Sequence, residues 1–578
     1  MKILKTIVST LLLAVATAAG LAAQTLEPAS ATGGGEARAL SADGRWMAFE
    51  RDGNVFLYDR NTRTNVLVSR AAGSTTQGGN GPSSQASVSA DGRYVVFGSM
   101  ATDLAAGTPD AEYRFFLFDR LTGAVRLVGR TGPFDGPGQP HTARISADGN
   151  WVAFTSFAPN LVAGQQEPPS PSDTSDVFLW SRETGSTSLV SRTAAGAAVA
   201  GNRGSENPLL SSDGRYIAFY SFATDLVPGQ GPGDADPDLL LFDRTTGKTV
   251  LVARIADPLI LTGRGAPAFS MSADGRFLVY NVWGDEDLES WLYDRTVGTP
   301  ELIHATAETP RMSADGRYVV FRHAIDFQLY LWDRSARTTT LVSRPNPAAY
   351  TISSTGRYVS FLSADLGPAG QTPAPEREAR EDNYDLFLVD RTAGTTVLIS
   401  RSKTSPSLAA GGAEGPLLMS AGGEQVAFTS AVDFAAADSN HLRDAYLFSL
   451  TAPTGGGPTP LPPCKLLDTR RRADRPALRS DTRRTVRAAG VCGVPSTAKS
   501  VSVTVTALQG TGKGNLRLYA GNDTVNSSGI LRFEKNATRS ATFNVPLATN
   551  GAGTIAILPF VAGKGTVQVI VEVNGYSQ

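Results

Sequence analysis

The sequence predicts an all-β protein, and three observations support this fold class. Glycine and proline are abundant, with 59 and 34 copies in 578 residues, and both disfavour helices. Apolar residues come in short runs such as Tyr94–Phe97, bounded by turn residues instead of recurring at helical spacing. A Ser-Ala-Asp-Gly turn also recurs along most of the chain. Many short strands joined by tight turns are therefore expected.

The recurring unit is organised around that turn. Its copies start at Ser41, Ser89, Ser146, Ser211, Ser272 and Ser313, with degenerate copies at Ser353 (SSTGR) and Ser420 (SAGGE). We expect the aspartate to bond nearby backbone N–H groups and the glycine to take a positive φ. Asp148 is thus predicted to shape a turn and to take no part in a chemical site. The Asp-Arg pair that ends a later strand, as at Asp119-Arg120, is predicted to form an ion pair between neighbouring units.

Eight such units fill residues 35 to 450, and repeats of this length indicate a propeller or a solenoid. Strands such as Phe115–Phe118 are apolar on both faces, as expected for a sheet packed between two others. The last unit lacks its fourth strand, and residues 24–30 lie upstream of the first turn, where such a strand would belong. The prediction is an eight-bladed β-propeller over 24–450, closed by an N-terminal strand.

The repeated residues resemble the TolB-type (WD-like) propeller repeat, whose hallmark is a Ser-Pro/Ala-Asp-Gly turn. The resemblance covers about 420 of the 578 residues. It implies the fold and no single function, because such propellers serve binding proteins, lyases and peptidases alike. Oligogalacturonate-lyase-type enzymes of this class use metal-binding histidines, which makes catalysis the competing hypothesis.

The N-terminus predicts export. Lys2 and Lys5 precede an apolar run over 7–15 and small residues up to Ala23, so residues 1–23 read as a signal peptide. We expect a secreted protein, periplasmic or extracellular, with no transmembrane segment in the mature chain. The net charge of −1 carries no nucleic-acid signature. We therefore expect no nucleic-acid partner, and a monomer.

Landmark spacing predicts where the propeller binds. The aspartate of the Ser-Ala-Asp-Gly turn and the aspartate of the Asp-Arg pair are 16 residues apart in the first unit (Asp43 to Asp59). In the fourth unit they are 30 residues apart (Asp213 to Asp243). The turns around Ser-Ala-Asp-Gly and after Asp-Arg stay short throughout. Because successive connections of a meander alternate ends, the long, variable ones share one face. Function is expected on that long-loop face.

Two sets of residues there have side chains of the kind that bind metals. Asp234, Asp236 and Asp238 have the spacing that starts a calcium loop, without the glycine and distal glutamate of an EF-hand. Ca²⁺ is one interpretation, and solvated loop carboxylates are the other; no further cofactor is predicted. The four histidines, His141, His304, His323 and His441, fall in different units. They are predicted not to converge on one metal.

The C-terminal part differs in composition. Residues 451–463 are a Gly/Pro linker, and residues 464–578 contain strands such as Ser500–Val505 that alternate with period two, predicting a β-sandwich. Cys464 and Cys492, the only cysteines, are predicted to form a disulfide in an oxidising compartment. This region resembles a C-terminal module of secreted bacterial proteins, with an LDTR motif at its start and VEVNGY at its end. The resemblance implies a surface-associated accessory domain.

A basic segment in this region is the second candidate binding site. Between Lys465 and Arg487, nine basic and three acidic residues leave a net charge of +6 (9 − 3). Guanidinium forks bind anionic glycans or phosphates; the alternatives are a solvated segment or one that docks on the propeller's acidic loops. The candidate residues are Arg470, Arg471, Arg472, Arg475, Arg483 and Arg484.

The functional hypothesis combines these features. We expect an exported, non-catalytic binding or scaffold protein that recognises an envelope protein or polysaccharide through the long-loop face of the propeller. The alternative is a carbohydrate-active enzyme, a polysaccharide lyase or glycosidase, that uses the propeller pocket. No G-x-S-x-G motif is present, which argues against an accompanying hydrolase domain.

Overall fold

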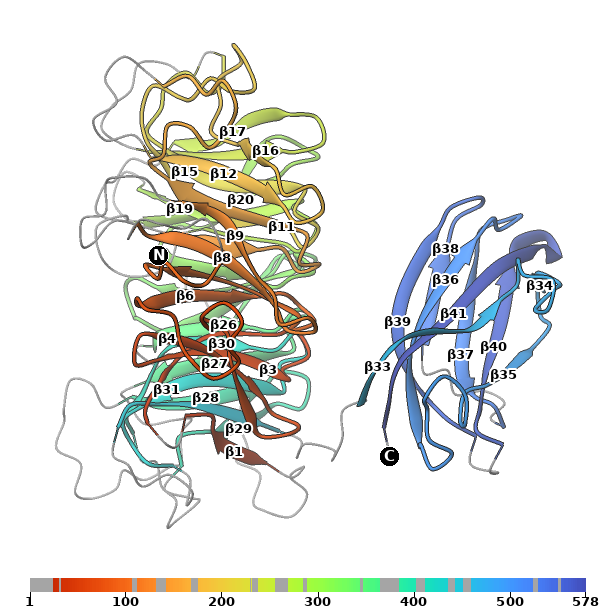
Figure 1. Cartoon of the computed structure of the whole chain (residues 1–578). Coiled ribbons are helices and arrows are strands. Elements are labelled where there is room, and N and C mark those ends of the chain that lie inside the picture. The colour runs from red at the N-terminus through yellow and green to blue at the C-terminus, as the bar shows by residue number, and fades with distance from the viewer. Residues whose placement is uncertain are drawn as a thin grey trace, which may run out of the picture. The chain divides into compact units, whose positions relative to one another are not determined.

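The chain divides into two compact units, Met1–Ala452 and Pro453–Gln578 (Figure 1). The computed structural model describes residues 24–30, 33–105, 112–130, 142–167, 175–228, 230, 237–254, 269–283, 288–343, 347–363, 384–401, 411–434, 442–450, 459–522, 529–548 and 552–577. These residues form strands and one short 3₁₀ turn, η2 (Ala562–Lys564), with no α-helix among them. The all-β prediction is confirmed. The predicted signal peptide, 1–23, lies outside the described residues.

The described part of the first unit contains eight four-stranded antiparallel sheets, taken here in chain order. The first four are β2 (Glu36–Leu40), β3 (Trp46–Arg51), β4 (Asn54–Asp59), β5 (Thr64–Leu67); β6 (Ser83–Val88), β7 (Tyr94–Ser99), β8 (Arg114–Asp119), β9 (Val125–Arg130); β10 (Ala143–Ile145), β11 (Trp151–Ser156), β12 (Asp176–Ser181), β13 (Thr187–Leu189); and β14 (Ser205–Leu210), β15 (Tyr216–Ser221), β16 (Asp238–Asp243), β17 (Lys248–Arg254).

The other four sheets follow the same order along the chain. They are β18 (Phe269–Met271), β19 (Phe277–Trp283), β20 (Leu288–Asp294), β21 (Pro300–His304); β22 (Ala307–Met312), β23 (Tyr318–His323), β24 (Leu329–Asp333), β25 (Thr338–Ser343); β26 (Pro347–Ile352), β27 (Tyr358–Ser363), β28 (Asp385–Asp390), β29 (Thr395–Leu398); and β30 (Ala413–Met419), β31 (Gln425–Ser430), β32 (Asp444–Ser449) with β1 (Thr25–Pro28).

The N-terminal strand completes the last sheet, as predicted. β1 pairs antiparallel with β32, so that Thr25 lies opposite Ser449. The hydroxyl of Ser30 donates to Asp444 Oδ1 at 2.7 Å, which ties the end of this segment to the same strand. In Figure 1 the red β1 lies beside the blue-green strands from the end of the unit. The closure covers an edge that β32 would otherwise expose.

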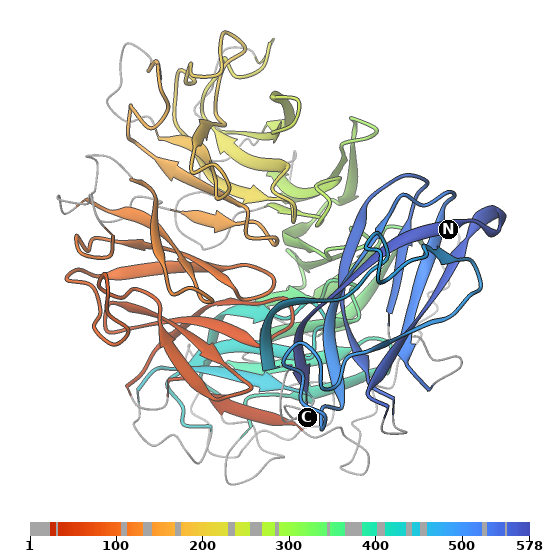
Figure 2. The same cartoon turned by 45° about the vertical axis from the view of Figure 1, so that its right-hand side comes forward.

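Backbone hydrogen bonds join the eight Ser-Ala-Asp-Gly-type turns in a closed circuit. Ala42 N donates to Ala90 O at 2.9 Å, Ala90 N to Ala147 O at 2.9 Å, and so on around the unit. The last link, from Ala421 N to Ala42 O at 2.8 Å, returns to the first turn. The intermediate links join Asp148 to Ser212, Ser212 to Ala273, Ala273 to Ala314, Asp315 to Ser354 and Ser354 to Ala421. Figure 2 shows the sheets following one another around a centre, from the red first sheet to the cyan last one.

The second strands of the sheets are buried on both faces. All six residues are buried in each of β7, β15, β27 and β31. The first strands lie next to one another instead, β2 beside β6 and β30, and β10 beside β6 and β14. The first strands are therefore innermost around the axis, and each sheet packs between its two neighbours, which explains the continuous apolar runs.

The second unit consists of two antiparallel sheets that share one apolar core. Val503 and Val571 of one sheet and Leu516 and Ile557 of the other belong to that core. The sheets are β33 (Thr459–Asp468), β41 (Thr566–Ser577), β36 (Ser500–Leu508), β39 (Arg539–Pro546), with β34 (Leu478–Arg479) pairing β41; and β35 (Arg484–Arg487), β40 (Thr554–Val561), β37 (Gly514–Ala520), β38 (Gly529–Phe533).

The start of this unit corrects one boundary. β33 begins at Thr459, so strand pairing starts inside the stretch predicted to be linker, of which 451–458 lies outside the described residues. The strand extends upstream because Thr459 and Pro460 lie opposite the end of β41. Cys464 and Cys492 form the predicted disulfide, with their Cα atoms 5.7 Å apart.

Candidate functional site

The aspartate of the repeated turn is structural. Asp148 Oδ1 accepts hydrogen bonds from the hydroxyl of Ser146 at 2.5 Å and from Asn150 N at 2.9 Å. The Ser146 hydroxyl in turn accepts Trp151 N at 3.0 Å, and Gly149 has a φ of 70°. Each carboxylate is thus occupied by its own turn, as predicted. The same bonds recur at Asp43, Asp91, Asp213, Asp274 and Asp315.

The Asp-Arg pair works differently from the prediction. Asp119 accepts both arms of Arg93, at 3.0 and 2.9 Å, and both residues belong to the same sheet. Arg120 is the residue that reaches the neighbouring sheet, where its guanidinium carbon lies 3.8 Å from the ring centroid of Trp46. The predicted ion pair between units is therefore wrong, because successive side chains leave a strand in opposite directions. The link between sheets is a cation–π contact.

This contact repeats around the unit with little variation. Arginines of the Asp-Arg or equivalent Ser-Arg pair lie 3.8 to 4.5 Å from an aromatic ring of the preceding sheet, in the pairs Arg182–Tyr94, Arg244–Trp151, Arg295–Tyr216, Arg334–Phe277 and Arg391–Tyr318. With the backbone circuit, these contacts lock the end of the unit that carries the short turns. That short-turn end is devoted to structure.

The opposite, long-loop end is described only in part. Where its connections are described, aspartate side chains join one connection to another. Asp103 Oδ1 accepts a hydrogen bond from Asn80 N at 2.9 Å, and Asp225 Oδ1 accepts one from Asn202 N at 3.0 Å. These two aspartates have a structural role. The acidic stretches 285–287 and 381–383 lie outside the described residues.

The calcium hypothesis stays a prediction. Asp234 and Asp236 lie outside the described residues. Asp238 opens β16, and its Oδ2 accepts a hydrogen bond from Gln230 Nε2 at 2.7 Å. The Gln230 amide also donates to Ala223 O and accepts Leu226 N, so it braces the loop before β16. Within the described ranges, no three His, Cys, Asp or Glu side chains group as metal ligands would.

Two of the four histidines come together, which the sequence prediction missed. The rings of His304 and His323 lie 5.2 Å apart, centroid to centroid, where the fifth and sixth sheets meet at the long-loop end. His323 Nδ1 lies 2.8 Å from Asp326 Oδ1, and Tyr330 donates to the other oxygen of that carboxylate. Burial, followed by the neighbouring His323, lowers the pKa of His304. His141 and His441 lie outside the described residues.

Carboxylates at the innermost strands are held by arginines where the first and last sheets meet. Arg443 pairs with Glu36 at 2.7 Å and also with Glu414. Arg38 pairs with Glu50 at 2.8 Å. These acids are therefore neutralised by partners, and the network fastens β2 to the last sheet.

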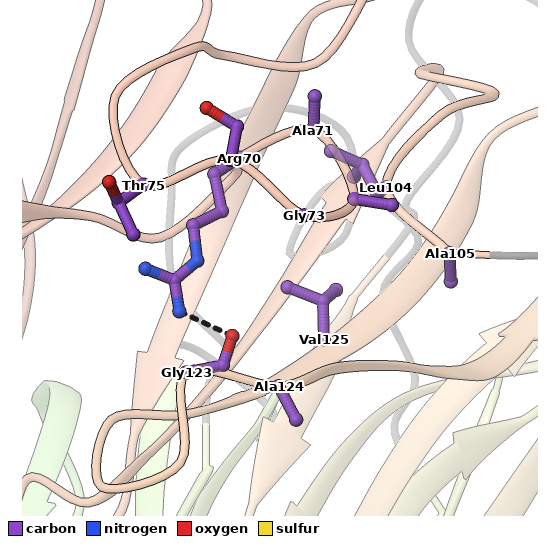
Figure 3. Close-up of a pocket in the computed structure, with 11 residues that line it drawn as sticks. Arg70, Ala71, Gly73, Thr75, Leu104, Ala105, Gly123, Ala124 and Val125 are labelled. Carbon is purple, nitrogen blue, oxygen red and sulfur yellow. Dashed lines mark hydrogen bonds between the residues drawn. The ribbon is translucent and has the colours of Figure 1, made fainter.

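A cavity of about 420 Å³ lies between the outer parts of the first two sheets (Figure 3). Its wall is formed mainly by small and apolar residues, among them Ala71, Leu104 and Val125. Arg70 is its one ionisable lining residue, and Figure 3 shows this guanidinium donating to Gly123 O. Because the guanidinium of Arg70 already donates to Gly123 O, the described wall of the cavity offers no free ionisable group for catalysis.

The six candidate arginines of the second unit divide into two groups. Arg470 makes a two-point ion pair with Asp468, at 2.9 Å for each arm, which holds the pKa of that carboxyl far below its usual range. Arg483 lies 5.3 Å from the ring centroid of Tyr519 and donates to a backbone carbonyl. The other four arginines make no close ion pair among the described residues. Arg471 is exposed, and its guanidinium lies 3.9 Å from Asp468, at the outer limit of an ion pair. Arg472 and Arg475 are exposed, and Arg484 is the half-buried first residue of β35.

No protein-family model matches the chain, and no curated protein matches it. Among solved structures, TolB from Acinetobacter baumannii is 15% identical, with 62% of this chain and 81% of that one covered and a TM-score of 0.30. An oligogalacturonate lyase from Vibrio parahaemolyticus is 12% identical, with 74% and 97% covered and a TM-score of 0.37.

A third similar structure is the β-propeller domain of the Trilobed protease from Pyrococcus furiosus, 13% identical, with 64% and 98% covered and a TM-score of 0.36. The four-stranded sheets of the first unit, joined in a closed circuit of turn-to-turn hydrogen bonds, make it a β-propeller. Identities this low assign none of these proteins' activities to the chain. Among the described residues, no helix has the length and apolar character needed to cross a membrane.

Proposed function

We propose that the chain is an exported, non-catalytic binding protein that recognises a protein or glycan of the cell envelope through the long-loop end of its propeller. The observation that carries this proposal is the contrast between the two ends. The short-turn end is closed by a circuit of backbone hydrogen bonds from Ala42 to Ala421 and back. The connections at the other end vary in length and lie outside that circuit, and such loops on a rigid scaffold are where binding usually resides.

The proposed architecture is an eight-bladed propeller followed by a β-sandwich. Eight four-stranded sheets in the described part of the first unit, and a circuit that returns to its first turn, support the blade count. Two sheets sharing one core support the sandwich. The disulfide between Cys464 and Cys492 fits an oxidising compartment outside the cytoplasm.

Where the first and last sheets meet, the state of the acids supports binding over catalysis. Glu36, Glu50 and Glu414 are all in ion pairs with arginines. Each of these carboxylates is held in place by a guanidinium group, so it is not free to reach a substrate. We assign these acids to closing the propeller.

The second unit is proposed to keep the protein at the envelope. Arg472 and Arg475 are exposed and have no ion pair among the described residues, so they can meet an anionic polymer. Exposed charge pairs are weak individually and screened by salt. The anchor is therefore expected to be released by salt in the range of a few hundred millimolar.

Sedimentation of the mature chain with insoluble envelope material tests the anchor. The double variant Arg472→Ala/Arg475→Ala should pellet less, and salt should release the wild type. The matched control Arg517→Ala/Arg532→Ala removes two exposed charges from another part of the same unit and should pellet like the wild type. Equal loss in both double variants would show that only net charge matters and would overturn the assigned segment.

A second experiment tests which end of the propeller recognises its ligand. Single cysteines replace two exposed alanines, Ala163 at the long-loop end and Ala336 in the short turn after β24, and each is coupled to a bulky maleimide. The label at position 163 should block capture of envelope protein or polysaccharide, and the label at 336 should not. The reverse result would refute the proposal. Shortening of a polysaccharide by the unlabelled protein would replace binding with catalysis.

A further inference from the structure

A second cavity, of about 370 Å³, lies at the propeller axis. Its wall comes from the innermost strands of four consecutive sheets, the third to the sixth, and from residues beside them. The lining residues are Thr142, Arg144, Asn207, Pro208, Leu209, Phe269, Ser270 and Arg311. A volume of this size falls in the range of roughly 300–1,000 Å³ typical of small-molecule sites.

Two arginines face this cavity, and no carboxylate lines it. The side chain of Arg144, from the middle of β10, makes no hydrogen bond or ion pair with any described residue. Its side chain is exposed to solvent at the cavity, and desolvation by the protein packed around it lowers the pKa of the guanidinium. Burial likewise lowers the pKa of Arg311, from β22. A desolvated guanidinium without a matching acid, as at Arg144, is costly unless something compensates its charge.

The contrast with the other side of the axis is direct. Arg38 and Arg443 each have at least one glutamate partner, at 2.6 to 2.8 Å. The fold therefore supplies acids where arginines only fasten sheets. Arg144 has been left without such an acid, although it lies on the same ring of innermost strands.

Hydroxyl groups beside the arginines are also short of partners. Thr142 Oγ1 is buried with no hydrogen-bond partner among the described residues. The Ser270 hydroxyl accepts Met312 N at 3.2 Å, which leaves its proton available to donate. Asn207 has a φ of 54°, at a bulge where the pairing of β14 with β15 shifts between Glu206 and Leu209. Bulges and left-handed residues of this kind re-aim side chains at functional sites.

We propose that this axial cavity binds a small organic molecule through one carboxylate or phosphate group. The guanidinium group of Arg144 takes the oxyanion through charge-assisted hydrogen bonds, and Arg311 adds a second positive charge to the cavity wall. The Ser270 hydroxyl and the Asn207 amide orient the polar remainder. Pro208, Leu209 and Phe269 line the rest of the cavity and pack against the carbon skeleton, which favours an organic anion over an inorganic one.

The site is independent of the recognition proposed for the long-loop end. Its residues lie on innermost strands, whereas the label at position 163 tests a connection. Loss of binding at one location leaves the other intact, so the two proposals fail separately. A ligand here would compensate Arg144 and brace four sheets at once.

Calorimetric titration of the full mature chain tests the site with defined probes. D-glucuronate represents the carboxylates and glucose 6-phosphate the phosphates, and glucose is the neutral control. One of the two anions should bind and raise the melting temperature, and glucose should do neither. Equal binding of glucose would overturn the role of charge. Equal binding of inorganic phosphate and glucose 6-phosphate would overturn the assignment of an organic ligand.

The variant Arg144→Gln should weaken binding of the anionic probe at least about tenfold, since it removes a charge-assisted fork. Lys248→Gln removes one exposed charge from β17 of the fourth sheet and should leave the affinity unchanged. Without ligand, Arg144→Gln should melt at the same temperature as the wild type or higher, because a desolvated charge without an acidic partner has gone. A lower melting temperature without ligand, with affinity retained, would make Arg144 a structural residue and refute the site.

Discussion

Replacing Gly92 by alanine tests how neighbouring sheets are locked at the short-turn end. Gly92 has a φ of 66°, and a Cβ there would lie 2.2 Å from Cδ1 of Trp46 in the preceding sheet. A left-handed alanine costs about 1–2 kcal/mol. Forcing a methyl group into a packed contact adds about 1–3 kcal/mol. We therefore expect the free energy of unfolding to fall by about 2–5 kcal/mol.

Gly394→Ala is the matched control. Gly394 has nearly the same φ, 65°, but a Cβ there would meet nothing within 4 Å. It should lose only the backbone contribution of about 1–2 kcal/mol. The two variants are compared by urea unfolding of the mature chain, followed through tryptophan fluorescence, provided that the slope m is the same for both. If both lose the same stability, the contact with Trp46 contributes nothing and the locking argument is refuted.

Three further perturbations follow from the structure. Because the pKa of His304 is lowered in the folded protein, this histidine takes up a proton at higher pH in the unfolded chain than in the folded one. The wild type should therefore lose stability as the pH falls from 6.5, the unfolded pKa, towards the folded pKa. In melting curves between pH 5 and 8, His304→Gln should lack this part of the loss, and parallel curves for the two proteins would contradict the prediction. Serines at Cys464 and Cys492 should lower the stability of the second unit by about 3–4 kcal/mol, as closing a 28-residue loop implies; an unchanged urea midpoint would exclude this. Deleting residues 24–30 should expose the edge of β32 and cause aggregation detectable by light scattering, whereas a monodisperse product would argue against the closure.

The features that could be predicted from sequence are those set by local bonds or by counting strands. The turn at Asp148 depends on contacts within five residues, so its pattern is readable directly. The closure by β1 was predictable because one unit lacked a strand and an unassigned segment remained. The disulfide followed from there being only two cysteines.

Contacts between sheets were less predictable. The partner of Arg120 depends on which way its side chain leaves the strand and on how far the preceding sheet is rotated. His304 and His323 meet only because a fourth strand ends beside the second strand of the next sheet, which no spacing rule predicts. Arg144 is one arginine in a three-residue strand, and its importance emerges only when the first strands prove to be innermost.

The circuit of turn-to-turn hydrogen bonds has a consequence for how this protein can change. The circuit uses backbone groups alone, so side chains outside the turns can change without breaking its hydrogen bonds. Lengthening a connection at the far end leaves it intact, and doubling a loop costs only about 0.6 kcal/mol in closure entropy. Under the proposed binding function, insertions in one sheet's long connection would change specificity, while the hydrogen-bonded turns that hold the sheets together stay unaltered.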